Sequence, residues 1–511
     1  MKKKLKKLKE LRKGLDTDKS LIKKQHDKGK LTAEERIDKL LDQGSFIELN
    51  EFSELESTDF GLDEKKKPRD GVITGYGTIN QRQVFVYAQD FTFMGGSMGA
   101  AHNKKIANVI EHSLKTGCPV IGLLDSGGAR IQEGVAGLDG GGRIFYNNTL
   151  ASGAVPQISA ILGPCAGIAA YSPALTDFVF MTDKVSKMFI TGPDVIRSVT
   201  GEKTDFESLG GAFVHNQKSG NAHFMADDEE QCFDMIKQLL SYLPQNNLET
   251  PPVNKTGQTR DRKHKVLETI VPDDPKASYD MKGVIEEIFD KNSFFEINQG
   301  YAQNIIVGLA RLDNNVVGII ANQPKILAGC LDIGSSDKIS RFVRLCDSFN
   351  IPLVNLVDVT GYLPGVDQEH NGIIRHGAKI LYAFSEATVP KISLVIRKAY
   401  GGAYIALVSK EMGFDKVLAW PTAEIAVMGA DQAVNIINRK ELKGKNPDKL
   451  RKKKTEEFSD KFLNPYVAAK EGRVDKVIEP KDTRKSLVGM LEMMANKRER
   501  RPAKKHGNMP L

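Results

Sequence analysis

Two short glycine-containing segments have the residue types and spacing that could support chemistry. Each follows an apolar run and precedes a stretch expected to be helical: residues 166–169 read Ala-Gly-Ile-Ala, and residues 400–404 read Tyr-Gly-Gly-Ala-Tyr. Glycine lets another group approach the main chain closely. The N–H groups at a helix start have no partner within the helix and lie at the positive end of its dipole. The two segments could therefore form two sites that stabilise a developing oxyanion through backbone amides. Glycines at such turns more often serve tight packing, so the turns alone leave both uses open.

The apolar runs that lead into these turns belong to an internal repeat. In the first half, the run 119–125 begins with Pro and ends with Asp, and a second Pro-initiated run begins at residue 156. In the second half, the run 352–358 has the same pattern, and its partner begins at residue 390 at nearly the same spacing. Paired signatures at matching spacing indicate that the two halves are diverged copies of one domain.

Each copy has the pattern of an α/β domain. Runs such as 84–87, 120–124 and 158–162 are apolar, rich in β-branched residues and bounded by Gly or Pro, as buried strands are. Residues 103–115 and 336–349 instead place apolar side chains on one face of a helix. The alternation predicts strands covered by helices in each half.

The chain length supports two domains, because 511 residues exceed what one hydrophobic core usually holds. Residues 251–275 are rich in Pro, Thr, Asp and basic residues, which is typical of a linker. We therefore predict an N-terminal domain over residues 1–250 and a C-terminal domain over residues 276–511.

The formal charge of +8 is concentrated at the two ends of the chain. Residues 1–13 carry eight Lys or Arg against one Glu, and residues 497–505 carry six against one. The remaining body is slightly acidic, and no zinc-finger spacing or other nucleic-acid-reading motif is present. We expect solvated basic tails and no nucleic-acid binding.

Cysteine usage and hydropathy predict a cytoplasmic protein. The five cysteines are widely spaced and form no C-x-x-C pair, which suits a reducing compartment. No apolar run follows the basic N-terminus, so no secretory signal is expected. The uncharged stretch 157–176 contains two Pro and two Gly, and it predicts a strand, a turn and a helix in place of a membrane span.

Other kinds of active site are poorly supported. The nine histidines lack H-E-x-x-H spacing, so no metal site is predicted, and neither a G-x-x-x-x-G-K-[ST] phosphate loop nor a G-x-S-x-G elbow occurs. Main-chain oxyanion sites without an obvious side-chain nucleophile point to enolate chemistry on a carbonyl substrate.

Long motifs run in order through the chain: QDFT at 89–92, GGS at 95–97, DSGGARIQEG at 125–134, GPCAG at 163–167, YSPA at 171–174, NQP at 322–324, GYLPG at 361–365, GIIRHGAK at 372–379, RKAYGGAY at 397–404, WPTAE at 420–424 and KHGN at 505–508. Together they resemble the carboxyltransferase β-subunits of biotin-dependent acyl-CoA carboxylases, propionyl-CoA carboxylase above all. The resemblance covers nearly the whole chain.

This resemblance implies a fold of two tandem crotonase-like (ClpP/crotonase) spiral domains and gives roles to particular residues. The amides of Gly402 and Ala403 would hold the thioester enolate oxygen, and those of Gly167 and Ile168 the ureido oxygen of biotin. Cofactor contacts are expected from these turns and the residues beside them: Gly167, Ile168, Ala166, Gly401 and Tyr404. The expected substrate contacts are Ile405, Asn322, Gln323, Pro324, Gly128, Ala129 and Arg130.

The implied reaction moves a carboxyl group from carboxybiotin to the α-carbon of propionyl-CoA or acetyl-CoA, giving methylmalonyl-CoA or malonyl-CoA. The chain has no A-M-K-M biotin-attachment motif and no room for an ATP-binding domain. A biotin carboxylase subunit, which would use the ATP and bicarbonate, and a biotin carboxyl carrier protein are therefore expected as separate partners. Family members form hexamers built from dimers, with the site between the first domain of one subunit and the second of another.

Two residues depart from the pattern of the family. Ile168 stands where many members have a second Gly, and its side chain could crowd the biotin. Ile405 stands where propionyl-selective members often have Asp. An apolar residue at this position resembles enzymes that accept both acetyl- and propionyl-CoA, and also the decarboxylase subunits. Three alternatives stay open. The first is the carboxyltransferase subunit of a sodium-pumping methylmalonyl-CoA decarboxylase, which would associate with a membrane subunit. The others are a biotin-independent hydratase or isomerase of the crotonase type and a non-catalytic scaffold with the same fold.

Overall fold

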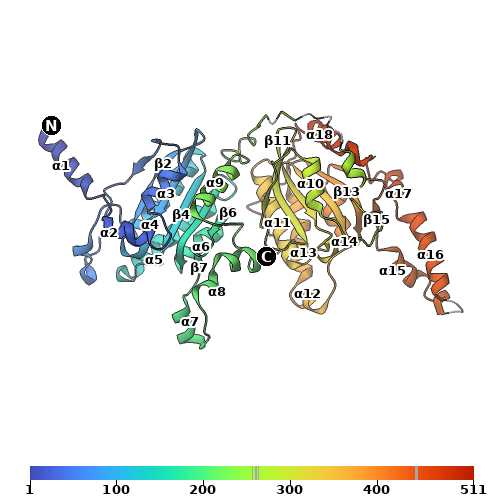
Figure 1. Cartoon of the computed structure of the whole chain (residues 1–511), viewed down its shortest axis with the longest axis horizontal. Coiled ribbons are helices and arrows are strands. Elements are labelled where there is room, and N and C mark those ends of the chain that lie inside the picture. The colour runs from blue at the N-terminus through green and yellow to red at the C-terminus, as the bar shows by residue number, and fades with distance from the viewer. Residues whose placement is uncertain (256, 259, 261, 263, 444–446) are drawn as a thin grey trace. The chain divides into compact units, whose positions relative to one another are not determined.

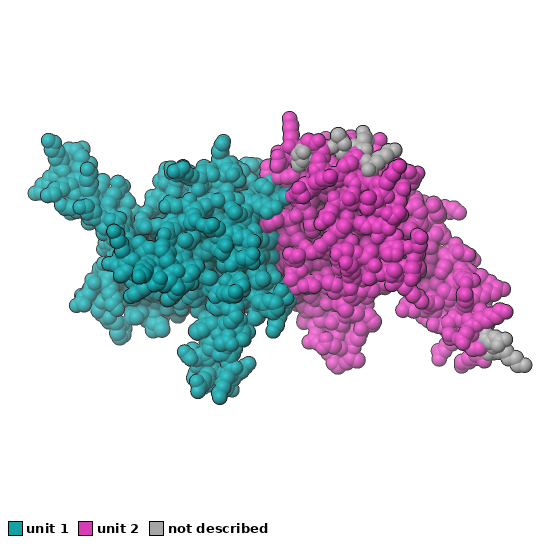
Figure 2. Space-filling model, viewed as in Figure 1, with its two compact units in different colours: residues 1–249 teal, residues 250–511 magenta. Residues whose placement is uncertain are grey.

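The computed structural model describes residues 1–511 except 256, 259, 261, 263 and 444–446, and its elements are labelled in Figure 1. The chain divides into two compact units, residues 1–249 and residues 250–511, which are coloured separately in Figure 2. Each unit contains one eight-stranded sheet.

The sheet of unit 1 has the order β1-β2-β3-β4-β5-β6-β8, and β7 pairs with β5 beside this path. The first three strands are antiparallel, whereas every pairing from β3 onward is parallel. The strands are β1 (Ile47–Leu49), β2 (Val72–Ile79), β3 (Arg82–Gln89), β4 (Val120–Ser126), β5 (Gln157–Ala166), β6 (Phe178–Thr182), β7 (Lys187–Phe189) and β8 (Phe224–Ala226).

Capping residues mark the ends of some helices of unit 1. Helix α3 starts with a capping box between Thr32 and Glu35, and α4 ends at Gly117, whose φ of 66° closes the helix in the left-handed conformation. The helices are α1 (Lys2–Lys13), α2 (Lys19–His26), α3 (Ala33–Leu40), α4 (Ala100–Thr116), α5 (Val135–Ala151), α6 (Ile168–Leu175), α7 (Pro193–Thr200), α8 (Phe206–Gly210) and α9 (Glu229–Leu240).

Unit 2 repeats this topology strand for strand. Its sheet has the order β9-β10-β11-β12-β13-β14-β16, and β15 pairs with β13 as β7 pairs with β5. The strands are β9 (Phe295–Ile297), β10 (Ile305–Leu312), β11 (Asn315–Asn322), β12 (Leu353–Val359), β13 (Lys391–Tyr400), β14 (Lys416–Ala419), β15 (Glu424–Ala426) and β16 (Lys476–Val477). The internal repeat predicted from the sequence is thus confirmed as a repeated fold.

The helices of unit 2 follow the same plan. Helix α11 corresponds to α4 and begins with a capping box between Asp332 and Ser335. The helices are α10 (Met281–Ile288), α11 (Ile333–Ser348), α12 (Val366–His370), α13 (Ile373–Glu386), α14 (Gly401–Val408), α15 (Ala430–Ile437), α16 (Pro447–Phe462), α17 (Pro465–Lys470) and α18 (Thr483–Met493).

The central strands are buried on both faces, as parallel strands between helices must be. Every residue of β4 and of β12 is buried. Helices α4 and α11 each pack an apolar face onto their sheet, with Ile106 and Ile110 in unit 1 and Ile339 and Val343 in unit 2 all at most 1% exposed. The predicted strands 84–87, 120–124 and 158–162 lie within β3, β4 and β5.

Each unit also neutralises a buried aspartate in the fourth strand of its sheet, but with cations from different places. In unit 1, the Asp125 carboxylate lies 2.6 Å from Lys30 Nζ and 3.0 Å from Arg36 Nη1, both from the N-terminal segment. In unit 2, the Asp358 carboxylate lies 3.0 Å from Nε of Arg397, which comes from the neighbouring strand β13. Both aspartates are almost completely buried, so each needs its partner.

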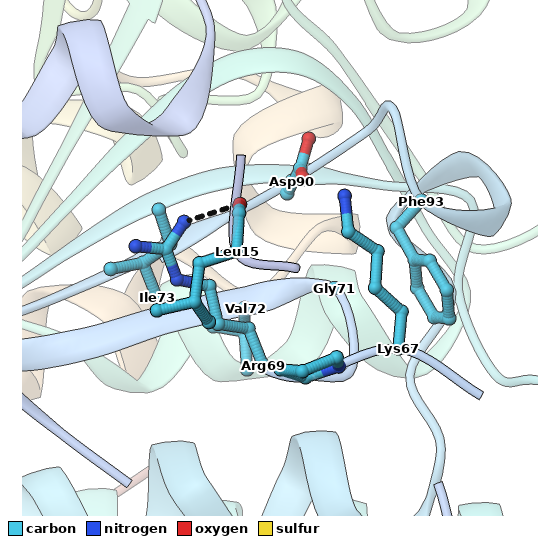
Figure 3. Close-up of a pocket in the computed structure, with 9 residues that line it drawn as sticks. Leu15, Lys67, Arg69, Gly71, Val72, Ile73, Asp90 and Phe93 are labelled. Atoms are coloured by element: carbon cyan, nitrogen blue, oxygen red, sulfur yellow. Dashed lines mark hydrogen bonds between the residues drawn. The ribbon is translucent and has the colours of Figure 1, made fainter. Parts of the chain in front are cut away.

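Within unit 1, the segment that precedes β1 is held partly by Arg69, which lies beside a small pocket (Figure 3). Arg69 Nη1 donates to the carbonyl of Leu15 at 3.3 Å, and its other nitrogens bind the Glu48 carboxylate at 2.8 Å. Leu15 is 8% exposed. The pocket holds about 10 Å³, which leaves room for roughly one water molecule.

The predicted linker 251–275 includes residues 256, 259, 261 and 263, which lie outside the described residues. Among its described residues, a short 3₁₀ turn spans Lys265–Glu268 and buries Leu267. In the described part of the chain, no helix is both long and apolar enough to cross a bilayer. The uncharged stretch 157–176 forms β5, a turn and α6, as predicted.

Candidate functional site

The turn of unit 2 joins the end of β13 to helix α14 and leaves backbone amides without intrahelical acceptors. Tyr400 is the N-cap residue, and no side chain caps the helix. Because the first intrahelical bond is donated one turn later, the N–H groups of Gly402 and Ala403 have no acceptor within α14. Gly401 turns the chain with φ of 58°, and a Cβ here would lie 3.1 Å from the carbonyl oxygen of Val427.

A partly buried tyrosine packs against this turn. Tyr362 lies between α13 and α14: its ring is 2.9 Å from the position of a Cβ on Gly377 and 3.7 Å from that of a Cβ on Gly402. Its hydroxyl donates weakly to the carbonyl of Gly377 at 3.4 Å. Burial raises the pKa of Tyr362 to about 12, so the phenol is neutral at physiological pH.

The turn of unit 1 joins β5 to α6 with a closely similar backbone. Gly167 has φ of 60° and is the N-cap of α6, again without a side-chain cap. Its own N–H donates to the carbonyl of Phe189 in β7 at 3.1 Å. Ala170 N–H donates to the carbonyl of Gly167 at 3.0 Å. The amides that remain at the start of α6 without an intrahelical acceptor are those of Ile168 and Ala169.

The internal repeat allows the two turns to be aligned residue by residue. Gly167 and Gly401 are equivalent, because both follow the fifth strand of their sheet and both turn at a positive φ. Ile168 therefore matches Gly402, and Ala169 matches Ala403. The predicted amide pair of Gly167 and Ile168 is one residue out of register with the pair of Gly402 and Ala403. The pair of Gly167 and Ile168 stays a prediction, and the structure adds that the Gly167 amide has an acceptor within the fold, the carbonyl of Phe189.

The side chain of Ile168 is partly buried at this turn. It packs against the hydrophobic core of unit 1, and its Cδ1 lies 3.2 Å from the position of a Cβ on Gly141 in α5. The absence of a side chain at Gly141 makes room for it. The volume of the Ile168 side chain is therefore accommodated within the core of unit 1.

Gly128 and Ala129, which the sequence predicts as substrate contacts, follow the end of β4, and Gly128 lies beside this turn. Gly128 has φ of 98°, and a Cβ there would lie only 2.8 Å from the carbonyl oxygen of Ala166. Ala129 forms an isolated parallel bridge with Met98. The close approach to the 166–168 turn explains why a glycine is required.

Arg130, also expected at the substrate, has a completely buried side chain. Its guanidinium binds Asp70 at 2.6 Å and Glu133 at 2.8 Å and also donates to the carbonyl of Ser97. It stacks on Phe93 at 5.6 Å. The guanidinium thus organises the interior of unit 1 and has no exposed surface with which to bind a ligand.

Residues 322–324 are buried as well, and their polar groups are used within unit 2. Asn322 donates to the carbonyl of Gly329 and accepts from Asp358 N–H, whereas the Gln323 amide binds Asp280 and Met281 N–H. Pro324 is buried beside them. By contrast, Ile405 on α14 is 47% exposed, and Tyr404 is partly exposed. Of the expected substrate contacts in unit 2, only Ile405 presents an open side chain.

The two cavities described in this structure have linings that include no residue of the glycine turns. A cavity of about 550 Å³ in unit 2 is lined by residues at the amino ends of its central strands, including Val316, Pro352 and Pro390, and by the end of α18. The turn at 400–404 follows the carboxyl end of β13, where parallel sheets usually bind ligands. In the described residues, no group of three or more His, Cys, Asp or Glu side chains is arranged to hold a metal.

Sequence reasoning missed three residues at the turns: Ala169, Tyr362 and Glu424. Ala169 could have been found by aligning the two turns, since it occupies the place of Ala403. Tyr362 and Glu424 were noted only as parts of motifs. Glu424 accepts a hydrogen bond from the Tyr400 phenol, a contact that depends on how β15 pairs with β13.

The chain matches a known protein family over most of its length. Residues 24–509 match the family model described as the carboxyl transferase domain. The chain is 57% identical over 491 residues to the carboxyltransferase subunit of propionyl-CoA carboxylase from Haloferax mediterranei, covering 96% of this chain and 95% of the relative. It is 54% identical over 491 residues to the α subunit of methylmalonyl-CoA decarboxylase from Propionigenium modestum, with the same coverage.

A solved structure is similarly close. The crystal structure of transcarboxylase 12S, described as a hexamer with methylmalonyl-CoA and methylmalonic acid bound, matches with a TM-score of 0.97 and 52% identity over 100% of this chain and 98% of that one. The match confirms the predicted fold, an α/β protein of two tandem crotonase-like domains related by the repeat.

Proposed function

We propose, from the premise that this chain belongs to the carboxyl transferase family, that it transfers a carboxyl group from carboxybiotin to the α-carbon of a short-chain acyl-CoA. The observation that supports this best is the pair of glycine turns. Each presents two helix-start amides at the end of a central parallel strand, which suits a reaction with two carbonyl-derived anions.

In unit 2, the N–H groups of Gly402 and Ala403 would receive the thioester oxygen as the enolate forms. These donors lie at the positive end of α14 and need no rearrangement when charge develops. Ile405, one turn along the same helix, presents an exposed apolar side chain toward solvent. We assign it to contact the acyl chain, which agrees with a substrate as small as a propionyl or acetyl group.

In unit 1, the N–H groups of Ile168 and Ala169 would receive the ureido oxygen of biotin. This assignment moves the pair one residue from Gly167 and Ile168, because the Gly167 amide is already bonded to Phe189. Ala166 and Gly167 still shape the turn, and Gly401 and Tyr404 have the corresponding places in unit 2. No side chain caps the first turn of α6, and the Ile168 side chain packs against the core, so neither occupies these amides.

No protein side chain needs to act as the base in this scheme. Bound carboxybiotin would supply both the carbon dioxide and, through its ureido nitrogen, the base for the α-proton. Tyr362, the phenol beneath the unit 2 turn, is kept neutral by burial. The role of this chain is then to bind both partners, hold them in register and stabilise negative charge.

We further propose that the chain works with a separate biotin carboxylase, which consumes ATP and bicarbonate, and a separate biotin carboxyl carrier protein. It would act in the cytoplasm and assemble as a hexamer, and a hexamer is the assembly that the crystal structure of transcarboxylase 12S describes for that protein. Identity to the propionyl-CoA carboxylase subunit is the higher of the two, 57% against 54% for the decarboxylase subunit. Carboxylation is accordingly the favoured direction.

Reconstitution tests this function. Purified chain would be combined with a biotin carboxylase, biotinylated carrier protein, ATP and labelled bicarbonate, and the rates with acetyl-, propionyl- and butyryl-CoA compared. We expect label in an acid-stable acyl-CoA product only when both carrier and acyl-CoA are present. Turnover of an acyl-CoA that is unaffected by omitting biotin would indicate a hydratase or isomerase instead.

A further inference from the structure

Tyr400 forms a side-chain bond at the point where strand β13 becomes helix α14. It is the last residue of β13, the N-cap of α14, and 8% exposed. Its phenol donates a hydrogen bond to the carboxylate of Glu424, the first residue of β15. Glu424 is partly buried.

The strand register shows what this bond connects. Tyr400 pairs with Ala426 in the parallel ladder, so Glu424 lies two residues earlier on the same face of β15. The segment after β15 passes directly under the turn: the Val427 carbonyl oxygen approaches Gly401, and Gly429 lies 3.5 Å from Tyr400 Cε2 when a Cβ is placed on it. The phenol ring therefore fills the space between the start of α14 and the start of α15.

Unit 1 lacks this connection. Ala166 and Lys187 occupy the equivalent positions, because Pro164 pairs with Lys187 as Lys398 pairs with Glu424. An alanine has no donor, and Lys187 instead makes an ion pair with Glu207 of α8. The side-chain bond is thus a feature of the unit 2 turn alone among the two equivalent positions.

We propose that Tyr400 and Glu424 are positioning residues: their hydrogen bond fixes the start of α14 against β15, and so holds the Gly402 and Ala403 amides in line with the developing enolate oxygen. The inference rests on the proposed function, because it assigns a task to the bond only if these amides stabilise an oxyanion. Tyr400 acts through the backbone and does not itself touch the substrate.

The phenol keeps its role as a donor over the whole working pH range. Burial is the main cause that raises the pKa of Tyr400 well above its usual value near 10, and the Glu424 carboxylate adds to the rise. The proton therefore stays on the Tyr400 phenol, which remains the donor. A change of pH between 6 and 9 should leave the bond intact.

The test compares four variants in the reconstituted complex. Tyr400→Phe and Glu424→Ala should each lower kcat about 10-fold with KM for acyl-CoA changed less than about twofold, because misplaced donors weaken only transition-state binding. The double variant should be no worse than either single one, since both remove the same bond. Glu424→Gln keeps an acceptor oxygen and should restore most of the rate.

A matched pair elsewhere in unit 2 serves as the control. Tyr382 on α13 donates to Glu386 at 3.2 Å, one helical turn away and apart from the glycine turn. Tyr382→Phe removes the same kind of bond and should leave kcat unchanged. Hydrogen–deuterium exchange of peptides covering residues 400–408 should accelerate in Tyr400→Phe but not in Tyr382→Phe.

The outcomes separate this inference from the proposed function. If the wild-type chain carboxylates acyl-CoA and Tyr400→Phe retains full kcat, the positioning role is wrong while the function stands. Equal losses in Tyr400→Phe and Glu424→Gln would also overturn it, because Gln keeps an oxygen that can accept the phenol hydrogen bond and would then have failed to restore the rate. If the wild-type chain shows no biotin-dependent turnover, the proposed function itself fails, and faster exchange at residues 400–408 would then report only on local structure.

Discussion

The glycine turns of units 1 and 2 have nearly the same backbone but different supporting side chains. Gly167 and Gly401 turn at φ of 60° and 58°, and each precedes a helix without a side-chain cap. In unit 1, the residue after the glycine is Ile168, whose side chain enters the core over Gly141. In unit 2 the corresponding residue is Gly402, and the nearby space is filled by the ring of Tyr362.

The isolated strand bridges indicate that a large and a small side chain have exchanged places between the two units; we call this the exchange of volumes. Ala129 pairs with Met98 in unit 1, and Tyr362 pairs with Leu331 at the equivalent place in unit 2. Unit 1 thus combines a small residue at the bridge with a large one at the turn, whereas unit 2 combines Tyr362 with Gly402. Cores tolerate such exchanges when the total volume is kept. The comparison teaches that the repeat retained the pair of free amides while the packing beneath them diverged.

The largest expected effect comes from removing an amide at one turn. Gly402→Pro deletes an N–H at a position where the first turn of a helix accepts proline, so the fold should persist. We expect carboxylation to fall about 10³-fold, roughly 4 kcal/mol. Steady-state rates of Gly402→Pro and Ile168→Pro would show whether both turns act. The control is Gly402→Ala, which keeps the N–H and whose Cβ would lie 3.7 Å from the Tyr362 ring. Full activity in both proline variants would refute the shared role.

The buried aspartates should differ in their sensitivity to losing a cation. Arg397→Met leaves Asp358 buried without an opposite charge and should lower the free energy of unfolding by about 3 kcal/mol. Lys30→Met leaves Asp125 paired with Arg36 and should cost only about 1 kcal/mol. Chemical unfolding of both variants measures the difference. Equal losses would mean that Arg36 alone does not neutralise Asp125.

The exchange of volumes can be tested by giving the unit 2 turn the side chains of the unit 1 turn. Gly402→Ile places a large side chain beside Tyr362 and should destabilise unit 2 by about 2 kcal/mol through overpacking. Adding Tyr362→Ala should recover part of this loss, since the pair then resembles Ile168 and Ala129. Thermal unfolding of the single and double variants gives the coupling. Strict additivity would contradict the exchange.

The smallest effect, when it is taken per pH unit, is the dependence of stability on pH. His102 is buried in unit 1, where α11 of unit 2 has Ser335 at the equivalent place. Burial lowers the pKa of His102 to about 3, while an unfolded histidine titrates near 6.5. Between these values the unfolded chain binds more protons, so stability should fall as pH decreases, by about 1.4 kcal/mol for each pH unit. This contribution is complete above about 6.5 and absent below about 3.

His102→Gln should flatten this slope. Unfolding free energies of the variant and the wild-type chain at pH 6 and pH 5 provide the measurement. The same slope in both proteins would assign the acid sensitivity to another group.

The fold could be anticipated because its signals are local. The Pro-initiated apolar runs, the helical face of residues 103–115 and the glycine turns are all visible in short windows, and each is found as predicted in β4, β5, α4 and the starts of α6 and α14. Part of the site could not be anticipated. Arg130 and residues 322–324 lie in the motifs of the family, but the structure uses their side chains to join segments far apart in the chain.

The sequence by itself determined that two α/β copies exist and that each ends a central strand with a glycine turn into a helix, because these features depend on neighbours a few residues apart. Only the tertiary structure decided which amides at those turns remain free and where the side chain of Ile168 goes. The Gly167 amide is bonded because β7 pairs with β5, and Ile168 turns inward because Gly141 leaves space on α5. Both depend on contacts between distant segments, which no short stretch of sequence encodes.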